Sequence, residues 1–117
     1  MELQQKAGPR WGWFLQRASA LLLVIGLFAH FWVLHYALEK PVNFDKVAAR
    51  LQSPEWVIFD VLLLGIALYH GLNGIWNIIM DYAPKAGTKR GVSFVLWLFG
   101  IVAFTFGAYA LIPFKTL

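Results

Sequence analysis

The chain has 117 residues, of which 60% are hydrophobic and only 14% are charged, a balance that excludes an ordinary soluble globular domain. It contains no cysteine, which excludes disulfide bonds and thiolate-bound metal or iron–sulfur sites. The net charge of +4 comes from basic residues that flank the apolar runs and form no single stripe, which argues against nucleic-acid binding.

Three apolar runs dominate the sequence, and we predict membrane-spanning helices over about 16–38, 55–81 and 91–113. Each run is long enough to cross a hydrocarbon core about 30 Å thick at roughly 1.5 Å per residue. Because the bilayer interior offers the backbone no water, such segments should be helical. The first run is too long for the apolar region of a signal peptide, so we expect it to be retained. The predicted fold is all-α, a single integral-membrane domain over 1–117 with three transmembrane helices.

The start of the first span carries the first candidate functional residues. Trp11 and Trp13 are typical of an aromatic anchor at the level of the lipid headgroups. Arg17 follows at the membrane surface, where an arginine ordinarily reaches back to those headgroups. It could instead neutralise haem propionates or polarise a quinone oxygen, and Ser19 would add a hydroxyl to the same region.

Two histidines lie further along the first span. His30 lies about 20 Å from the surface marked by Arg17, close to the depth expected for His70 of the second span. One chain could therefore supply both axial ligands of a haem, which makes His30 an alternative ligand of the haem iron. His35 lies near the opposite surface, and we interpret it as an interfacial histidine.

The first connection should contain a short interfacial helix over about 43–51. Asn43 is suited to cap this helix, whose apolar residues fall on one face, as expected along a membrane surface. Ser53 and Pro54 then provide an N-cap followed by proline at the first helical position, so the second span should begin there. Asp60 falls near the outer end of that span, where we expect contact with water to make its charge tolerable.

The second span contains the most informative residue, His70, deep within an apolar helix. An ionisable side chain at that depth predicts a functional site, and imidazole is a common axial ligand of haem iron. Gly71 and Gly74 remove side-chain bulk beside it, and Gly74 shares its helix face, so a flat macrocycle could approach closely. The structural alternative is a histidine that is hydrogen-bonded to a neighbouring helix.

Asp81 and Tyr82 close the second span, about three turns beyond His70 and at the same surface as Arg17. A phenol at that surface can donate a hydrogen bond to a quinone carbonyl oxygen, and a nearby carboxylate can orient it or relay protons. The ordinary alternative is an interfacial tyrosine beside an aspartate at a helix end.

The remaining segments set the topology. Pro84 and Gly87 mark a turn, and the third span carries Gly100 and Gly107 on one face, where small residues allow close helix packing. With three spans, six basic residues lie on the side of the N-terminus and four lie on the other side. The positive-inside rule then predicts a cytoplasmic N-terminus.

Two short motifs together resemble a known family. Gln16-Arg17-Ala18-Ser19-Ala20 opens the first span, and the pattern His70-x-x-x-Gly74-x-Trp76-x-x-x-x-Asp81-Tyr82 closes the second. This arrangement, with the chain length, the three spans and the predicted orientation, resembles the small hydrophobic membrane-anchor subunit of succinate dehydrogenase (succinate:quinone oxidoreductase, respiratory complex II). The resemblance extends over most of the chain.

The resemblance implies a role within an enzyme complex. It implies that His70 ligates haem b, with the second ligand supplied by the other membrane anchor, and that Arg17 lies near the haem propionates. It also implies that Tyr82 and Asp81 belong to a site for ubiquinone or menaquinone. The implied partners are a second membrane-anchor subunit, an iron–sulfur subunit and a flavoprotein subunit. The implied location is the cytoplasmic (inner) membrane of a bacterium or archaeon, in a complex shared by the respiratory chain and the tricarboxylic acid cycle.

The residues themselves agree with an anchor that has no catalysis of its own. The chain has neither cysteines for iron–sulfur clusters nor a glycine-rich phosphate loop for FAD. A fumarate reductase anchor and a haem-free structural membrane subunit stand as alternatives. A small transporter is disfavoured because three spans do not divide into an inverted repeat and Asp60 is too near a membrane surface.

Overall fold

The structure is a computed structural model that describes residues 10–37 and 41–112. These residues form four α-helices and one π-helical segment, and they contain no strand: α1 Arg10–Trp32, η2 Val33–Ala37, α2 Phe44–Leu51, α3 Pro54–Met80 and α4 Ala86–Leu111. Three segments are long and apolar enough to cross a membrane, namely Trp11–Tyr36, Pro54–Met80 and Ala86–Leu111. The predicted all-α fold with three transmembrane helices is therefore confirmed.

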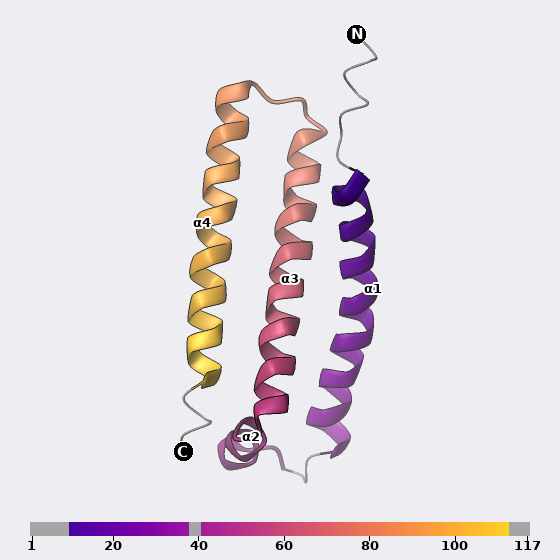
Figure 1. Cartoon of the computed structure of the whole chain (residues 1–117), viewed down its shortest axis with the longest axis vertical. Coiled ribbons are helices and arrows are strands. Elements are labelled where there is room, and N and C mark those ends of the chain that lie inside the picture. The colour runs from indigo at the N-terminus through magenta and orange to yellow at the C-terminus, as the bar shows by residue number, and fades with distance from the viewer. Residues whose placement is uncertain (1–9, 38–40, 113–117) are drawn as a thin grey trace.

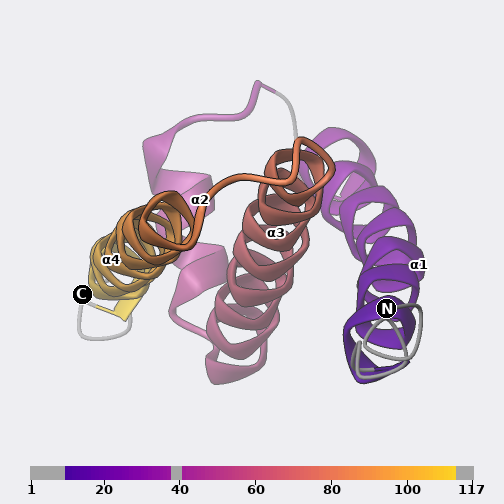
Figure 2. The same ribbon diagram turned by 90° about the horizontal axis from the view of Figure 1, so that it is seen from above.

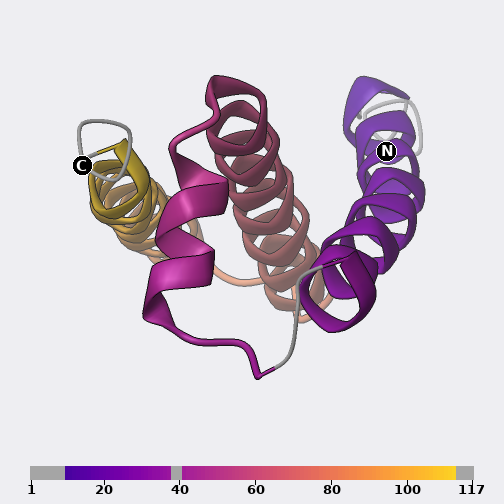
Figure 3. The same ribbon diagram turned by 90° about the horizontal axis from the view of Figure 1, so that it is seen from below.

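The three long helices lie side by side in one curved layer, with α3 in the middle (Figures 1 and 2). Both α1 and α4 pack against α3 and run antiparallel to it. The start of α1, the end of α3 and the start of α4 therefore meet at one end of the layer, which we call the Tyr82 end. The short helix α2 lies across the opposite end, which we call the α2 end (Figure 3).

The first helix begins at Arg10, about 1.7 turns before the predicted start of the span near residue 16. The proposed aromatic anchor is therefore part of the helix, and Trp11 and Trp13 are both exposed on it. At its other end the helix continues as η2, where the His35 ring stacks on that of Phe31 with centroids 3.9 Å apart. His35 Nδ1 also lies 3.0 Å from the carbonyl oxygen of Phe31, so this histidine is engaged within its own helix.

The caps of α2 and α3 follow the sequence signals. The Asn43 side chain accepts a hydrogen bond from the backbone N–H of Lys46 at 3.0 Å, which confirms the predicted cap. Ser53 is the N-cap residue of α3 and Pro54 is its first residue, as predicted. The Ser53 hydroxyl differs from a standard cap because it donates to the Glu55 carboxylate instead of accepting from a backbone N–H.

Glycines allow the helices to approach closely. A Cβ atom at Gly100 would lie 2.8 Å from Leu72 Cδ1, and one at Gly107 would overlap the Leu64 side chain, so the predicted close packing through these two residues is confirmed for α4 against α3. The same applies between α1 and α3, because a Cβ at Gly26 would lie 2.8 Å from Leu63 Cδ1. At these points leucine side chains of α3 pack directly against glycines of the outer helices.

The apolar surface of the described chain is mostly exposed. The buried apolar residues are Ala48, Leu51 and Val57, all at the junction of α2 with α3. Large side chains along both outer helices, such as Phe28 of α1 and Trp97 of α4, are open. Because exposing so much apolar surface to water would be unfavourable, this surface must be covered by lipid or by other membrane subunits.

Candidate functional site

His70 lies on the face of α3 that packs against α1, and its polar partner there is Ser19. His70 Nδ1 is 3.0 Å from Ser19 Oγ. The serine is 6% exposed, and its hydroxyl donates to the carbonyl oxygen of Gln16 at 3.0 Å. Among the described residues, none forms a hydrogen bond with His70 Nε2, the nitrogen on the other edge of the ring. The half-buried imidazole is therefore held by one nitrogen and free at the other.

Two further polar side chains join α1 to α3 beside this pair. Asn73 Nδ2 donates to Gln16 Oε1 at 2.8 Å, and Gln16 Nε2 donates to the carbonyl oxygen of His70 at 3.3 Å. Gln16 was not predicted to have a role of its own. The spacing could have indicated its role, because residues three apart share a helix face. Both the Gln16–Ser19 pair and the His70–Asn73 pair have that spacing. The four side chains form one polar cluster within the apolar span.

The glycines beside His70 are used differently from the prediction. A Cβ atom at Gly74 would lie 3.3 Å from Gln16 Nε2, so the space predicted to admit a macrocycle at Gly74 is filled by the side chain of Gln16. The correction follows from helix packing, because the face that carries Gly74 is turned toward α1. A Cβ at Gly71 would meet no atom within 4 Å, so the open space beside the imidazole lies at Gly71.

The structure separates His30 from His70. His30 Nδ1 lies 3.5 Å from Asp60 Oδ1, and Asp60 precedes His70 by ten residues of α3, or about 15 Å of helix. Two side chains that far apart cannot bind one iron atom, so the predicted haem ligation by His30 and His70 together is wrong. The depth count failed because the two helices align with Ser19 level with His70, and His30 lies about 16 Å further along α1.

Asp60 also differs from the prediction that water would solvate its charge. Its side chain is 8% exposed, and Oδ2 accepts a hydrogen bond from Arg50 Nη2 at 2.7 Å. Arg50 is itself 5% exposed and lies over the Trp56 ring, 5.0 Å from its centroid. Helix α2 folds back across the end of the layer and thereby brings a counter-ion to the carboxylate, a long-range contact that the local sequence pattern did not reveal.

Asp81 and Tyr82 follow α3 at the Tyr82 end, but Arg17 lies two residues before Ser19 on α1 and so near the level of His70, which differs from the predicted shared surface. The exposed Arg17 stacks its guanidinium 3.8 Å from the centroid of the Trp13 ring and donates to the Trp13 carbonyl oxygen at 3.3 Å. Asp81 caps the C-terminus of α3, and Tyr82 is 82% exposed. Asp81 lies eleven residues of helix beyond His70, or about 16 Å, so the backbones of Arg17 and Tyr82 lie at different levels of the layer.

The turn that presents Tyr82 has one unusual residue. Ala83 has a φ of 48°, in the left-handed region that an L-residue other than glycine or asparagine rarely adopts. The backbone N–H of Ala83 still donates to the carbonyl oxygen of Met80 at 3.0 Å, and the N–H of Tyr82 donates to the carbonyl oxygen of Ile79 at 3.1 Å. The chain thus leaves α3 through a tight turn that holds the Tyr82 backbone while its ring projects outward.

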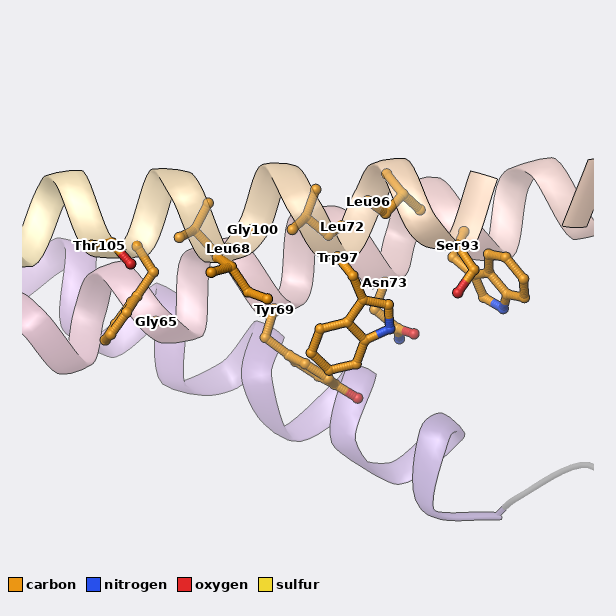
Figure 4. Close-up of a pocket in the computed structure, with 13 residues that line it drawn as sticks. Gly65, Leu68, Tyr69, Leu72, Asn73, Ser93, Leu96, Trp97, Gly100 and Thr105 are labelled. Atoms are coloured by element: carbon orange, nitrogen blue, oxygen red, sulfur yellow. The ribbon is translucent and has the colours of Figure 1, made fainter. Parts of the chain in front are cut away.

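A groove of about 620 Å³ lies between α3 and α4 (Figure 4). Its wall is mainly apolar, with Tyr69 and Leu72 on α3 and Trp97 and Phe104 on α4. None of the sequence-predicted site residues lines it. It therefore uses a different pair of helices from the contact of His70 with Ser19.

The donor set near His70 suits a preassembled cofactor better than a free metal ion. Within residues 10–37 and 41–112, no three His, Asp or Glu side chains are arranged to hold a metal ion together. A haem brings four nitrogen ligands of its own and needs only an axial donor from the protein. A half-buried imidazole with one nitrogen held and the other free fits that requirement.

Comparison with known proteins gives a consistent result. Residues 5–108 match the family described as succinate dehydrogenase/fumarate reductase transmembrane subunit. The succinate dehydrogenase hydrophobic membrane anchor subunit of Archaeoglobus fulgidus is 30% identical over 99 residues, which cover 85% of each chain. The protein of the same name from Thermoplasma acidophilum is 30% identical over 80% of this chain and 77% of its own length. The succinate dehydrogenase 2 membrane subunit of Mycobacterium tuberculosis is 30% identical over 79% of this chain and 66% of its own length.

Proposed function

This chain belongs to the succinate dehydrogenase/fumarate reductase transmembrane subunit family and is a multi-pass membrane anchor, and on that premise we propose that it holds haem b through His70 and helps to form a quinone site. Membership of the family implies that the chain associates with other subunits of an enzyme complex.

The geometry of His70 is the observation that carries the haem proposal. The imidazole lies in the middle of a transmembrane helix, Nδ1 is engaged by Ser19, and Nε2 has no hydrogen-bond partner in the described part of the chain. A bound haem would supply one-electron transfer, while the chain supplies the axial nitrogen and the apolar surroundings. Since His30 is too far away to bind the same iron, the second axial ligand would come from the second anchor subunit.

The quinone proposal rests on the Tyr82 end. The exposed phenol of Tyr82 can donate a hydrogen bond to a quinone carbonyl oxygen, and the adjacent Asp81 carboxylate can accept or relay a proton. Arg17 lies on α1 near the level of His70, where its charge could serve a haem propionate or a quinone oxygen. Ubiquinone and menaquinone both present the carbonyl oxygens that this arrangement would bind.

The surface of the chain suggests where the partners bind. The exposed apolar faces of the layer suit a second membrane anchor and lipid. By sequence, six basic residues lie on the side of the N-terminus and four on the other side, which favours a cytoplasmic N-terminus in a bacterial or archaeal membrane. The iron–sulfur and flavoprotein subunits would then dock at the Tyr82 end, close to the quinone site. The same reasoning applies to the anchor of a fumarate reductase, a complex in which electrons flow in the opposite direction.

The test is a His70→Ala variant of the chain within its purified complex. We expect the reduced-minus-oxidised spectrum to lose the haem b absorbance while the subunits still copurify. His35→Ala is the matched control, because His35 is an exposed histidine engaged within its own helix. A spectrum unchanged by His70→Ala would contradict the proposal and would leave a haem-free structural subunit as the better account.

A further inference from the structure

The hydroxyl of Ser19 lies between two hydrogen-bond partners, and it has one proton. The carbonyl oxygen of Gln16 can only accept, so the hydroxyl donates its proton there, at 3.0 Å. With that proton used, the 3.0 Å contact with His70 Nδ1 is a hydrogen bond only when Nδ1–H is the donor and Ser19 Oγ is the acceptor. A neutral imidazole has a single N–H, and here Nδ1 carries it. Nε2 therefore has a free lone pair.

We infer that Ser19 is a positioning residue that fixes the tautomer and ring orientation of His70, so that Nε2 is the nitrogen presented to a haem iron. This inference rests on the proposed function. A histidine that ligates a metal usually donates its other N–H to an acceptor, which orients the ring and increases its electron donation. Here that acceptor is the Ser19 hydroxyl, which donates its own proton to the backbone carbonyl oxygen of Gln16.

The surrounding contacts keep Ser19 in this role. Gln16 receives the Ser19 proton through its carbonyl oxygen, and its side chain bonds both Asn73 and the His70 carbonyl oxygen. These bonds hold α1 at a fixed height against α3. Because Ser19 is 6% exposed, bulk water cannot readily replace the hydroxyl as the acceptor for Nδ1–H.

The hydrogen bond from His70 Nδ1–H to Ser19 would affect the redox potential of a bound haem. Donation from Nδ1–H gives the ring partial imidazolate character, which stabilises the oxidised iron more than the reduced iron. Removal of the Ser19 hydroxyl should therefore weaken retention of the haem and move its midpoint potential to a more positive value. A residue that served only helix packing would not shift the potential in this way.

The experiment compares four variants of the full complex: Ser19→Ala, Ser19→Cys, Ser19→Thr and Ser93→Ala. Alanine removes the acceptor, cysteine replaces it by a poor one in nearly the same shape, and threonine keeps the hydroxyl. Ser93→Ala makes the same chemical change on α4, in the groove between α3 and α4 and away from His70. The readouts are the rate of haem loss to an excess of apomyoglobin and the midpoint potential of the haem.

We expect haem loss to be about 10- to 100-fold faster in Ser19→Ala, the usual effect of removing such a partner, with a positive shift of the potential. Ser19→Cys should change both quantities in the same direction by less, while Ser19→Thr and Ser93→Ala should match the unmodified complex. Should Ser19→Ala fail to assemble, the cysteine and threonine variants still decide the matter. Wild-type haem loss and potential in both Ser19→Ala and Ser19→Cys would overturn the inference. The His70→Ala variant tests haem binding itself. If His70→Ala lost the haem while both Ser19 variants behaved like the unmodified complex, the role of Ser19 would be overturned and the proposed haem site would stand.

Discussion

Arg50 Nη2 donates a 2.7 Å hydrogen bond to Asp60 Oδ2, and this pair joins the short helix α2 to the transmembrane helix α3. Both side chains are more than nine-tenths buried, and Arg50 Nε and Nη1 have no hydrogen-bond partner in the described structure. Taking two charges out of water is costly, and mutual attraction offsets that cost only while both are present. The pair therefore makes the position of α2 sensitive to either residue.

We predict that Arg50→Met destabilises the complex by about 3–5 kcal/mol, because it leaves the buried Asp60 carboxylate without its counter-ion. The double variant Arg50→Met with Asp60→Leu should recover most of the loss, since two apolar side chains can fill the same space. The midpoint of thermal unfolding of the purified complex measures both effects. Lys89→Met, which removes an exposed cation on α4, is the control and should leave the midpoint unchanged. A double variant no more stable than Arg50→Met would argue against the pairing.

We predict different results for alanine variants of the two transmembrane histidines. His70→Ala should lose the haem bound at that position, whereas His30→Ala should retain it, because His30 contacts Asp60 about 15 Å away along α3. Haem content per complex and the low-temperature spectrum of the α band distinguish the two variants. Loss of all haem in His30→Ala would show that the two histidines depend on each other after all.

Much of the fold was predictable from local sequence. The length of each apolar run set the three spans, and Asn43, Ser53 and Pro54 marked helix starts by chemistry that acts within a few residues. The start of α1 was missed because the aromatic and glycine residues after Arg10 suit an interfacial anchor and a helix equally well. Helix ends in such segments depend on packing and on the membrane, which the local pattern does not record.

The candidate site was predictable only in part. The position of Tyr82 and Asp81 at the end of α3 followed from span length, whereas Arg17 lies nearer to the level of His70 than predicted. The partners of the histidines did not follow, because the relative height of α1 and α3 is set by contacts between helices. A shift of that height decides whether His70 meets Ser19 or His30, whereas the pairing of Asp60 with Arg50 depends on how α2 folds back onto α3.

We predict that close packing of α4 on α3 fails when Gly107 acquires a branched side chain. A Cβ there already overlaps Leu64, so Gly107→Val should cost about 1–3 kcal/mol in stability, and Leu64→Ala should partly relieve it. At Gly91 a Cβ meets no atom within 4 Å, so Gly91→Ala is the control. It should be neutral or should stabilise the helix by up to about 1 kcal/mol, because alanine is the better helix former. Equal unfolding midpoints for the two glycine variants would contradict the packing seen between these helices.

We predict that Tyr82→Phe lowers the rate of quinone reduction while leaving assembly and haem content unchanged. The ring is 82% exposed and its backbone is held by the turn after α3, so removal of the hydroxyl should not disturb the fold. A single hydrogen bond to a quinone oxygen is worth about 1 kcal/mol, so kcat/KM for quinone should fall about fivefold.

The matched control is Tyr109→Phe, a tyrosine that is 74% exposed but lies toward the other end of α4. Electron transfer from succinate to a dye that accepts electrons before the quinone site should be unchanged in both variants, because that route does not reach the phenol. If Tyr82→Phe and Tyr109→Phe reduced quinone equally fast, the phenol at the Tyr82 end would be an interfacial anchor. If Tyr82→Phe alone were slow with quinone and normal with the dye, the lost hydroxyl would have to act on the quinone, because the fold and the earlier electron carriers would be shown to be intact.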